Sequence, residues 1–355
     1  MGNKTKILLF AYTKVNLGDN LFIYLLLKRY PNIDFYIHVV EKEYEKVYHN
    51  FENLHYLYEN RDFDKINVED FDAYLYVGGS IFMESEYARH ELKEVNKFVK
   101  RCNEKNKKFF YMSCNFGPYQ TEEYLNLAKE TYSLCGGICF RDKKSYNLFK
   151  EIPQVRQAPD MAFTLPVENV EKEKNTIGIS VISLAIREDL KEKEGPYNDF
   201  IKRIIIKFAK RNYQVTLFGF SEFEKDSEAI QTILSTVPDE YKNNVHVEIF
   251  KENIEEYLEK YAKMEYMVCG RFHSMILSML YGQKIYNLTY SKKQETVIEE
   301  SNFFNRYQPI RDMNYETILR KYYFKRASNY KLKKVIKEAE NQFNDLEDWI
   351  KNNYE

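Results

Sequence analysis

An arginine and a histidine, two residues apart, stand where a predicted strand gives way to a predicted helix. Cys269 ends an apolar strand, Gly270 makes the turn, and Arg271 and His273 lie at the start of an apolar helix. The first N–H groups of a helix have no partner within it, so they attract anions. A guanidinium can bind phosphate or carboxylate through paired hydrogen bonds, and an imidazole can exchange a proton near neutral pH. The pattern predicts an anion site in which Arg271 binds the anion and His273 carries acid/base chemistry or binds phosphate.

Other predicted strands also end in glycine and polar residues. Ligands of open α/β sheets bind beyond the carboxyl ends of the strands, and glycine lets backbone N–H groups approach an anion. Such turns use glycine for backbone geometry alone just as often. Each glycine therefore either contacts an anion or only allows the turn. The residues concerned are Asn16, Gly18, Asp19, Gly78, Gly79, Ser80, Asn115, Gly117, Arg141 and Gly219.

Apolar runs of strand length alternate with helical runs in two blocks, which predicts parallel sheets. In the first block strands are expected at 6–12, 35–40, 71–77, 108–113 and 137–141. A charged stretch at 166–175 is the predicted linker, and strands follow at 176–182, 214–219, 245–250, 266–269 and 284–288. We therefore predict two Rossmann-like domains with mainly parallel, doubly wound sheets, an architecture that resembles GT-B. The expected boundaries are 1–168 for the first domain, 169–312 for the second and 313–355 for a helical extension.

Within that extension, residues 329–351 read as one long, charged helix. It is either a solvated surface helix or a helix that crosses back onto the first domain.

Composition excludes several classes of protein. The net charge of −1 argues against a nucleic-acid binder. The five cysteines form no C-x-x-C pair, and no histidine–carboxylate cluster has metal-ligand spacing, so we expect neither disulfides nor a metal. No G-x-G-x-x-G or P-loop motif occurs. With no signal peptide or long apolar run, we expect a cytoplasmic protein with at most peripheral contact with the inner face of the membrane.

Taken in order, the motifs resemble those of the polysaccharide pyruvyl transferases. The most distinctive stretch is Arg271-x-His273-x-x-Ile276, followed by Gly282 and by Tyr290-x-x-Lys293. The resemblance spans roughly residues 7–298, and the remaining pieces fall in the expected order. They are Asn16-x-Gly18-Asp19, Gly78-Gly79, Gly117-Pro118, Arg141-Asp142-x-x-Ser145 and Pro159-Asp160-x-Ala162-Phe163.

The resemblance implies transfer of pyruvate from phosphoenolpyruvate onto two hydroxyls of one sugar, with no cofactor. The product is a cyclic ketal in a cell-surface polysaccharide, such as capsule or exopolysaccharide, or in its precursor, lipid-linked or not. By this resemblance His273, Arg271 and Asp19 are catalytic. The donor would bind Arg271, His273, Ser274, Lys293, Tyr290 and Gly270. The acceptor would bind Asn16, Gly18, Asp19, Gly78, Gly79, Ser80, Asn115, Gly117, Arg141 and Asp160.

Two other functions remain open from the sequence. One is a GT-B-type glycosyltransferase that uses a nucleotide-sugar donor, since such an enzyme would also place cations on a diphosphate. The other is a scaffold or sensor without catalysis in an envelope-polysaccharide assembly.

Overall fold

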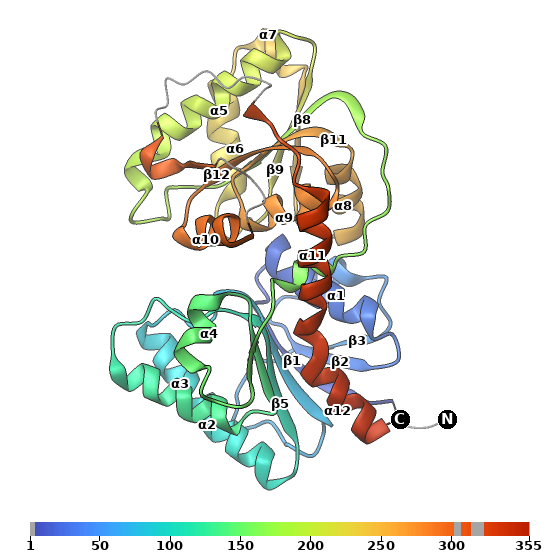
Figure 1. Cartoon of the computed structure of the whole chain (residues 1–355). Helices are drawn as coiled ribbons and strands as arrows, with labels where there is room; N and C mark the ends of the chain where they lie inside the picture. Colours follow the sequence, from blue (N-terminus) through green and yellow to red (C-terminus); the bar gives the residue numbers. More distant parts are fainter. Residues whose placement is uncertain (1–3, 302–306, 314–322, 355) are drawn as a thin grey trace. The chain divides into compact units, whose positions relative to one another are not determined.

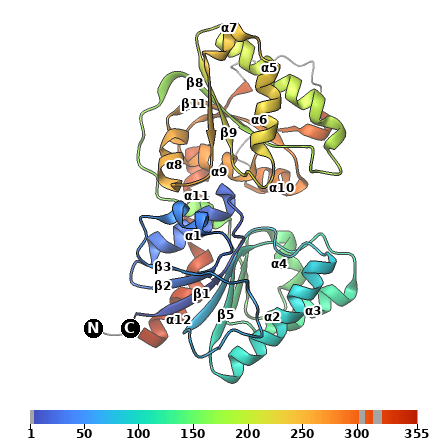
Figure 2. The ribbon, with the colours of Figure 1, turned by 180° about the vertical axis from the view of Figure 1, so that it is seen from behind.

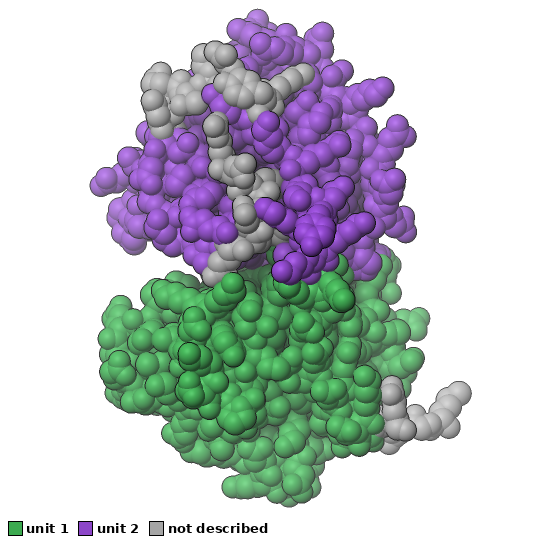
Figure 3. Space-filling model, viewed as in Figure 1, with its two compact units in different colours: residues 1–13, 19–164, 336–355 green, residues 14–18, 165–335 purple. Residues whose placement is uncertain are grey.

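The computed structural model describes residues 4–301, 307–313 and 323–354. The described chain forms two compact units (Figure 3). Unit 1 comprises residues 1–13, 19–164 and 336–355, and unit 2 comprises residues 14–18 and 165–335. Each unit is built around one sheet of parallel strands flanked by helices, which confirms the predicted fold class (Figure 1).

Unit 1 contains a seven-stranded sheet in the order β3-β2-β1-β4-β5-β6-β7. Its strands are β1 Lys6–Phe10, β2 Asp34–His38, β3 Leu54–Leu57, β4 Ala73–Val77, β5 Lys108–Cys114, β6 Gly137–Phe140 and β7 Val155–Gln157. Its helices are α1 Leu17–Arg29, α2 Glu86–Glu104, α3 Glu122–Leu134 and α4 Lys143–Phe149, with 3-10 turns η1 Lys42–Tyr48 and η2 Met161–Thr164. The strand order reverses between β1 and β4, so the two carboxyl ends at that point frame the place where such sheets bind ligands.

Aromatic side chains dominate the core of unit 1 beneath α2 and α3. Phe10 stacks on Phe109 with ring centroids 5.6 Å apart, and Tyr74 meets Phe98 edge-to-face at 4.9 Å. Such pairs add specific geometry to the burial of large apolar area. The abundance of Tyr and Phe in the sequence thus has a packing role in this unit.

Unit 2 contains a six-stranded sheet in the order β10-β9-β8-β11-β12-β13. Figure 2 shows its strands β8, β9 and β11 from behind. Its strands are β8 Glu173–Val181, β9 Gln214–Gly219, β10 Val245–Ile249, β11 Met264–Cys269, β12 Lys284–Thr289 and β13 Gln308–Pro309. Its helices are α5 Glu194–Ala209, α6 Asp226–Ser235, α7 Asp239–Lys242, α8 Ile254–Ala262, α9 Phe272–Leu280 and α10 Lys292–Ser301, with short 3-10 turns η3 Lys191–Lys193 and η4 Ile310–Asp312. Here the order reverses between β8 and β11, and β11 is the strand that leads into Arg271.

The C-terminal segment is not the single helix expected over 329–351. It consists of α11 Asn329–Ala339, the 3-10 turn η6 Glu340–Phe343 and α12 Asn344–Tyr354. The helix changes form where Gln342 and Phe343 become buried. The side chain of Gln342 accepts a hydrogen bond from the N–H of Ser113 (3.0 Å) and donates to the carbonyls of Ala158 (2.9 Å) and Pro159 (3.0 Å). Residues 336–355 are therefore anchored within unit 1.

Replacing Gln342 by leucine should weaken this anchor. The substitution leaves three backbone groups without their side-chain partner, and we expect the free energy of unfolding to fall by about 3 kcal/mol. Trp349, the only tryptophan, packs 6.1 Å from Phe110 in ring-centroid distance, so its fluorescence reports the anchor during urea denaturation. Gln120→Leu, at an exposed site, serves as the control. An unchanged denaturation midpoint in Gln342→Leu would show that the anchor contributes nothing.

Candidate functional site

The turn between β11 and α9 holds the predicted anion site in place. The hydroxyl oxygen of Ser180, on β8, accepts hydrogen bonds from the N–H groups of Gly270 (2.9 Å) and Arg271 (3.3 Å). Arg271 is the N-cap residue of α9 and has an extended backbone, so the unpaired N–H groups of the first helical turn follow directly after it. Arg271 thus lies where the strand order reverses and where a helix begins.

The guanidinium of Arg271 is buried against two carboxylates. One terminal nitrogen donates to Glu224 Oε2 at 2.5 Å, the other pairs with Asp226, and the side chain of Arg271 is 7% exposed. Burial alone would lower the pKa of Arg271, but Asp226 and Glu224 raise it above its ordinary value. Within the described part of the chain, its Nε–H has no hydrogen-bond partner.

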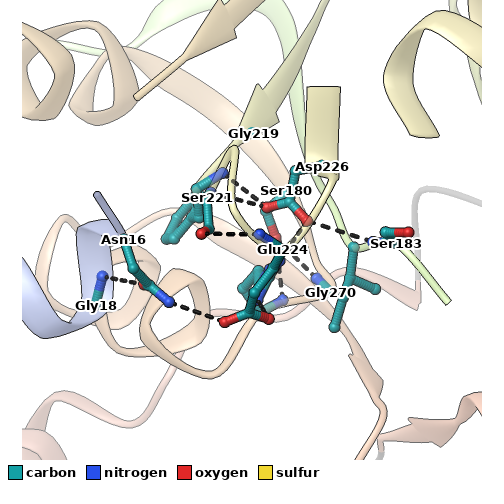
Figure 4. Close-up of polar contacts among 12 residues, drawn as sticks. Asn16, Gly18, Ser180, Ser183, Gly219, Ser221, Glu224, Asp226 and Gly270 are labelled. Atoms are coloured by element: carbon teal, nitrogen blue, oxygen red, sulfur yellow. Dashed lines mark hydrogen bonds and ion pairs between the residues drawn. The ribbon is translucent and has the colours of Figure 1, made fainter. Parts of the chain in front are cut away.

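Glu224 joins several parts of this cluster, and Figure 4 shows it beside Asp226 and Asn16. Its Oε2 also accepts from Arg187 at 2.7 Å, and its Oε1 accepts from the Asn16 amide at 3.0 Å. Burial would raise the pKa of Glu224, but Arg271 and Arg187 hold it below its ordinary value. The guanidinium of Arg187 in turn lies over the ring of Tyr290, 4.5 Å from its centroid.

The sequence analysis missed Glu224, Asp226 and Arg187. A signal for the two carboxylates was present, because acidic residues follow Gly219, which ends β9 next to β8. Nothing in the sequence indicates that they pair with an arginine 45 or more residues further along.

Residues 14–18 belong to unit 2 although they follow the first strand of unit 1. Asn16 forms an antiparallel bridge with Ser221, and the N–H of Leu17 donates to the carbonyl of Phe220 at 2.9 Å. Gly18 packs against His273 so closely that a Cβ on Gly18 would lie 2.1 Å from the imidazole Nδ1. The structure thus brings Asn16 and Gly18, predicted acceptor ligands, to Arg271 and His273, predicted donor ligands.

The other predicted donor residues take different positions. The Ser274 hydroxyl points into the core, where it lies 2.8 Å from the hydroxyl of Tyr261, which also contacts Ser278 at 2.8 Å. Tyr290 is half-buried and supports Arg187. Lys293 belongs to α10, but its side chain lies outside the described part of the structure.

Unit 1 gathers most of the remaining predicted acceptor residues at its carboxyl edge. Arg141, whose side chain is 4% exposed, pairs with Asp160 at 2.6 Å and donates to Asn115 Oδ1 at 3.1 Å. The Ser80 hydroxyl donates to the same oxygen at 3.3 Å. A Cβ on Gly79 would lie 2.5 Å from the Arg141 guanidinium, so a larger residue there would displace that guanidinium. These residues follow β4, β5 and β6, which are neighbours in the sheet, together with the segment after β7.

Gly78, Gly117 and Asp19 complete the predicted acceptor set. Gly78 directly follows β4 and is buried. The N–H of Gly117 donates to the carbonyl of Phe82 at 2.9 Å, which joins the loops after β4 and β5. Asp19 lies in the first turn of α1, in unit 1.

Among the described residues, no group of three or more histidine, cysteine or acidic side chains could hold a metal ion. Within the same residues, no helix combines the length and the apolar composition needed to cross a bilayer.

Three solved structures share the fold of this chain. The Staphylococcus aureus MnaA–UDP structure superimposes with a TM-score of 0.55 at 10% identity and covers 97% of this chain and 90% of that chain. A UDP-GlcNAc 2-epimerase from Neisseria meningitidis bound to UDP-GlcNAc gives 0.52 at 13%, with 86% and 88% covered. A further UDP-N-acetylglucosamine 2-epimerase gives 0.51 at 12%, with 99% and 96% covered. At such identities the likeness concerns the fold alone, which is of the GT-B type.

Residues 16–292 match the polysaccharide pyruvyl transferase family, and this range contains every predicted site residue except Lys293. The chain belongs to that family, so it is a transferase of polysaccharide biosynthesis. None of the curated proteins compared with it matches the chain.

Replacing Gly18 by alanine should displace the His273 imidazole. The new methyl group would overlap the ring, and we expect the free energy of unfolding to fall by about 1–3 kcal/mol. NMR chemical shifts of the His273 ring and thermal denaturation measure the two effects. Gly195→Ala is the matched control, because a Cβ at Gly195 meets nothing within 4 Å. Unchanged His273 shifts in Gly18→Ala would contradict the contact.

Replacing Asp160 by asparagine should destabilise unit 1. It leaves the charge of Arg141 buried without its counter-ion, which typically costs about 3–5 kcal/mol. Urea denaturation at neutral pH measures the loss. Asp239→Asn, at a side chain that is 94% exposed, should change the midpoint little. Equal effects of the two substitutions would show that the Arg141 pair has no special weight.

Proposed function

We propose that this chain transfers pyruvate from phosphoenolpyruvate onto two hydroxyls of one sugar residue in a cell-surface polysaccharide or its precursor. The observation that carries the proposal is Arg271 and His273 at the first turn of α9, at the point where the sheet order of unit 2 reverses. A helix start and a guanidinium together suit a phosphorylated carboxylate. Membership of the family supports the reaction class.

The reaction balances without a cofactor. A proton adds to the methylene carbon of phosphoenolpyruvate, and the adjacent carbon becomes electrophilic. One sugar hydroxyl attacks that carbon. The bond between this carbon and the phosphate oxygen then breaks, and the second hydroxyl attacks the same carbon and closes the ring. The two hydroxyl protons are released; one replaces the proton taken up by carbon and the other leaves with hydrogen phosphate.

The residues around Arg271 take the donor-side roles in this scheme. Arg271 and the N–H groups at the start of α9 hold the anionic donor, and Arg187 supplies a second guanidinium nearby. His273, packed on Gly18, transfers protons or binds the departing phosphate. These interactions stabilise negative charge where it develops on the leaving phosphate.

The acceptor side is assigned to the polar residues of unit 1. Asp160 is engaged by Arg141, so it orients neighbouring groups, whereas Asp19 is our candidate for activating a hydroxyl. Asn115 accepts from both Arg141 and Ser80 through Oδ1, and this network would orient the polar edge that meets the sugar.

Substitution of Arg271 by lysine tests the donor assignment. Lysine keeps the charge but loses the paired hydrogen bonds, and we expect kcat/KM for phosphoenolpyruvate to fall by about 100-fold or more. The assay follows phosphate release with free and lipid-linked saccharide acceptors, and circular dichroism checks that the variant is folded. Lys251→Arg, at an exposed site of unit 2, is the control. Absence of phosphate release across the acceptors, combined with consumption of a nucleotide sugar, would favour the glycosyltransferase instead.

A further inference from the structure

The two carboxylates that neutralise Arg271 are held in different ways. Asp226 is fully buried and accepts backbone N–H groups from Phe220 (2.9 Å), Ser221 (3.1 Å) and Ser183 (3.3 Å). These bonds fix Asp226 to the ends of β9 and β8. It is a permanent counter-ion of Arg271.

Glu224 has no such backbone bonds to its carboxylate among the contacts described. It is held by three side chains, Arg271, Arg187 and Asn16, and is 24% exposed. It lies in a surface turn whose neighbour Phe223 is 63% exposed. A carboxylate held only by side chains at a surface turn can leave at lower cost than one fixed by the backbone.

The position of one Glu224 oxygen indicates what it replaces. Oε2 accepts from Arg271 at 2.5 Å and from Arg187 at 2.7 Å, so a single anionic oxygen joins the two guanidiniums. A phosphate oxygen would seek the same donors. With Asp226 and Glu224 both in place, the charges of the two arginines are already balanced, and an incoming anion gains little from them.

We propose that Glu224 is a displaceable counter-ion, a positioning residue that holds Arg271 and Arg187 before the donor binds and yields them to the phosphate of the donor. This inference rests on the proposed function for the identity of the anion. Its consequence for the reaction is that the returning carboxylate competes with the product phosphate and promotes its release.

Binding of inorganic phosphate and of phosphoenolpyruvate to the full chain, measured by calorimetry, tests the proposal. Glu224→Gln removes the competing charge at nearly constant shape, so phosphate should bind about tenfold more tightly. A merely structural role predicts the opposite sign, because loss of a site-building contact weakens binding. Glu222→Gln is the matched control: Glu222 lies in the same turn but pairs with the exposed Lys251 at 3.0 Å, and its loss should leave affinity unchanged.

The outcomes separate the two proposals. Suppose that phosphate binding by the unaltered chain depends on Arg271. If folded Glu224→Gln then binds phosphate equally or more weakly, the counter-ion inference is overturned and the proposed function still stands. Binding of neither phosphate nor phosphoenolpyruvate by the unaltered chain overturns both. If Glu224→Gln does not fold, Asn16→Ala weakens the hold on Glu224 without changing charge, and phosphate must then bind more tightly than to the unaltered chain for the inference to survive.

Discussion

The buried ion pair between Arg271 and Asp226 holds together the part of unit 2 that carries the candidate site. A guanidinium that is largely shielded from water needs a fixed negative partner, and Asp226 is fixed by backbone N–H groups from the ends of two neighbouring strands. The ion pair therefore fixes the ends of β8 and β9 relative to the start of α9. The same constraint places Arg271 at a helix start beside the reversal of strand order. Positions of this kind bind anions in α/β proteins.

How much of this was accessible from the sequence depends on the length and the pattern of each element. Long apolar strands such as β1, β5 and β9 were predicted because burial on both faces leaves a continuous hydrophobic run. The strands β3, β7 and β13 were missed. They have four, three and two residues and none is fully buried along its length, so they leave too short a pattern to recognise.

The candidate site also contains residues that the sequence predicts and residues that it does not. Residues adjacent in sequence, such as Arg271 and His273, were recognised because a strand, a turn and a helix fix their relation locally. The partners of charged residues were not, since Arg141 with Asp160 and Arg271 with Glu224 meet only once the sheet order is set. Sequence thus locates polar residues at an edge of the sheet, while structure determines which of their charges are already neutralised. The sequence indicates an open anion ligand at Arg271, whereas the structure shows its guanidinium already paired with Glu224 and Asp226.

The division of the chain into units has a consequence for how this fold can be taken apart. A fragment starting at Leu165 would contain every strand of unit 2, yet it would lack residues 14–18 and with them the packing surface under His273. A fragment ending at Thr164 would lack residues 336–355 and leave the backbone around Ser113 and Ala158 without the side chain of Gln342. Each unit thus contains a short segment that is separated in sequence from the rest of that unit. Recombination between members of such a family would therefore have to exchange both short segments together with a unit. That requirement ties the inheritance of the region around Arg271 and His273 to that of the first βα loop.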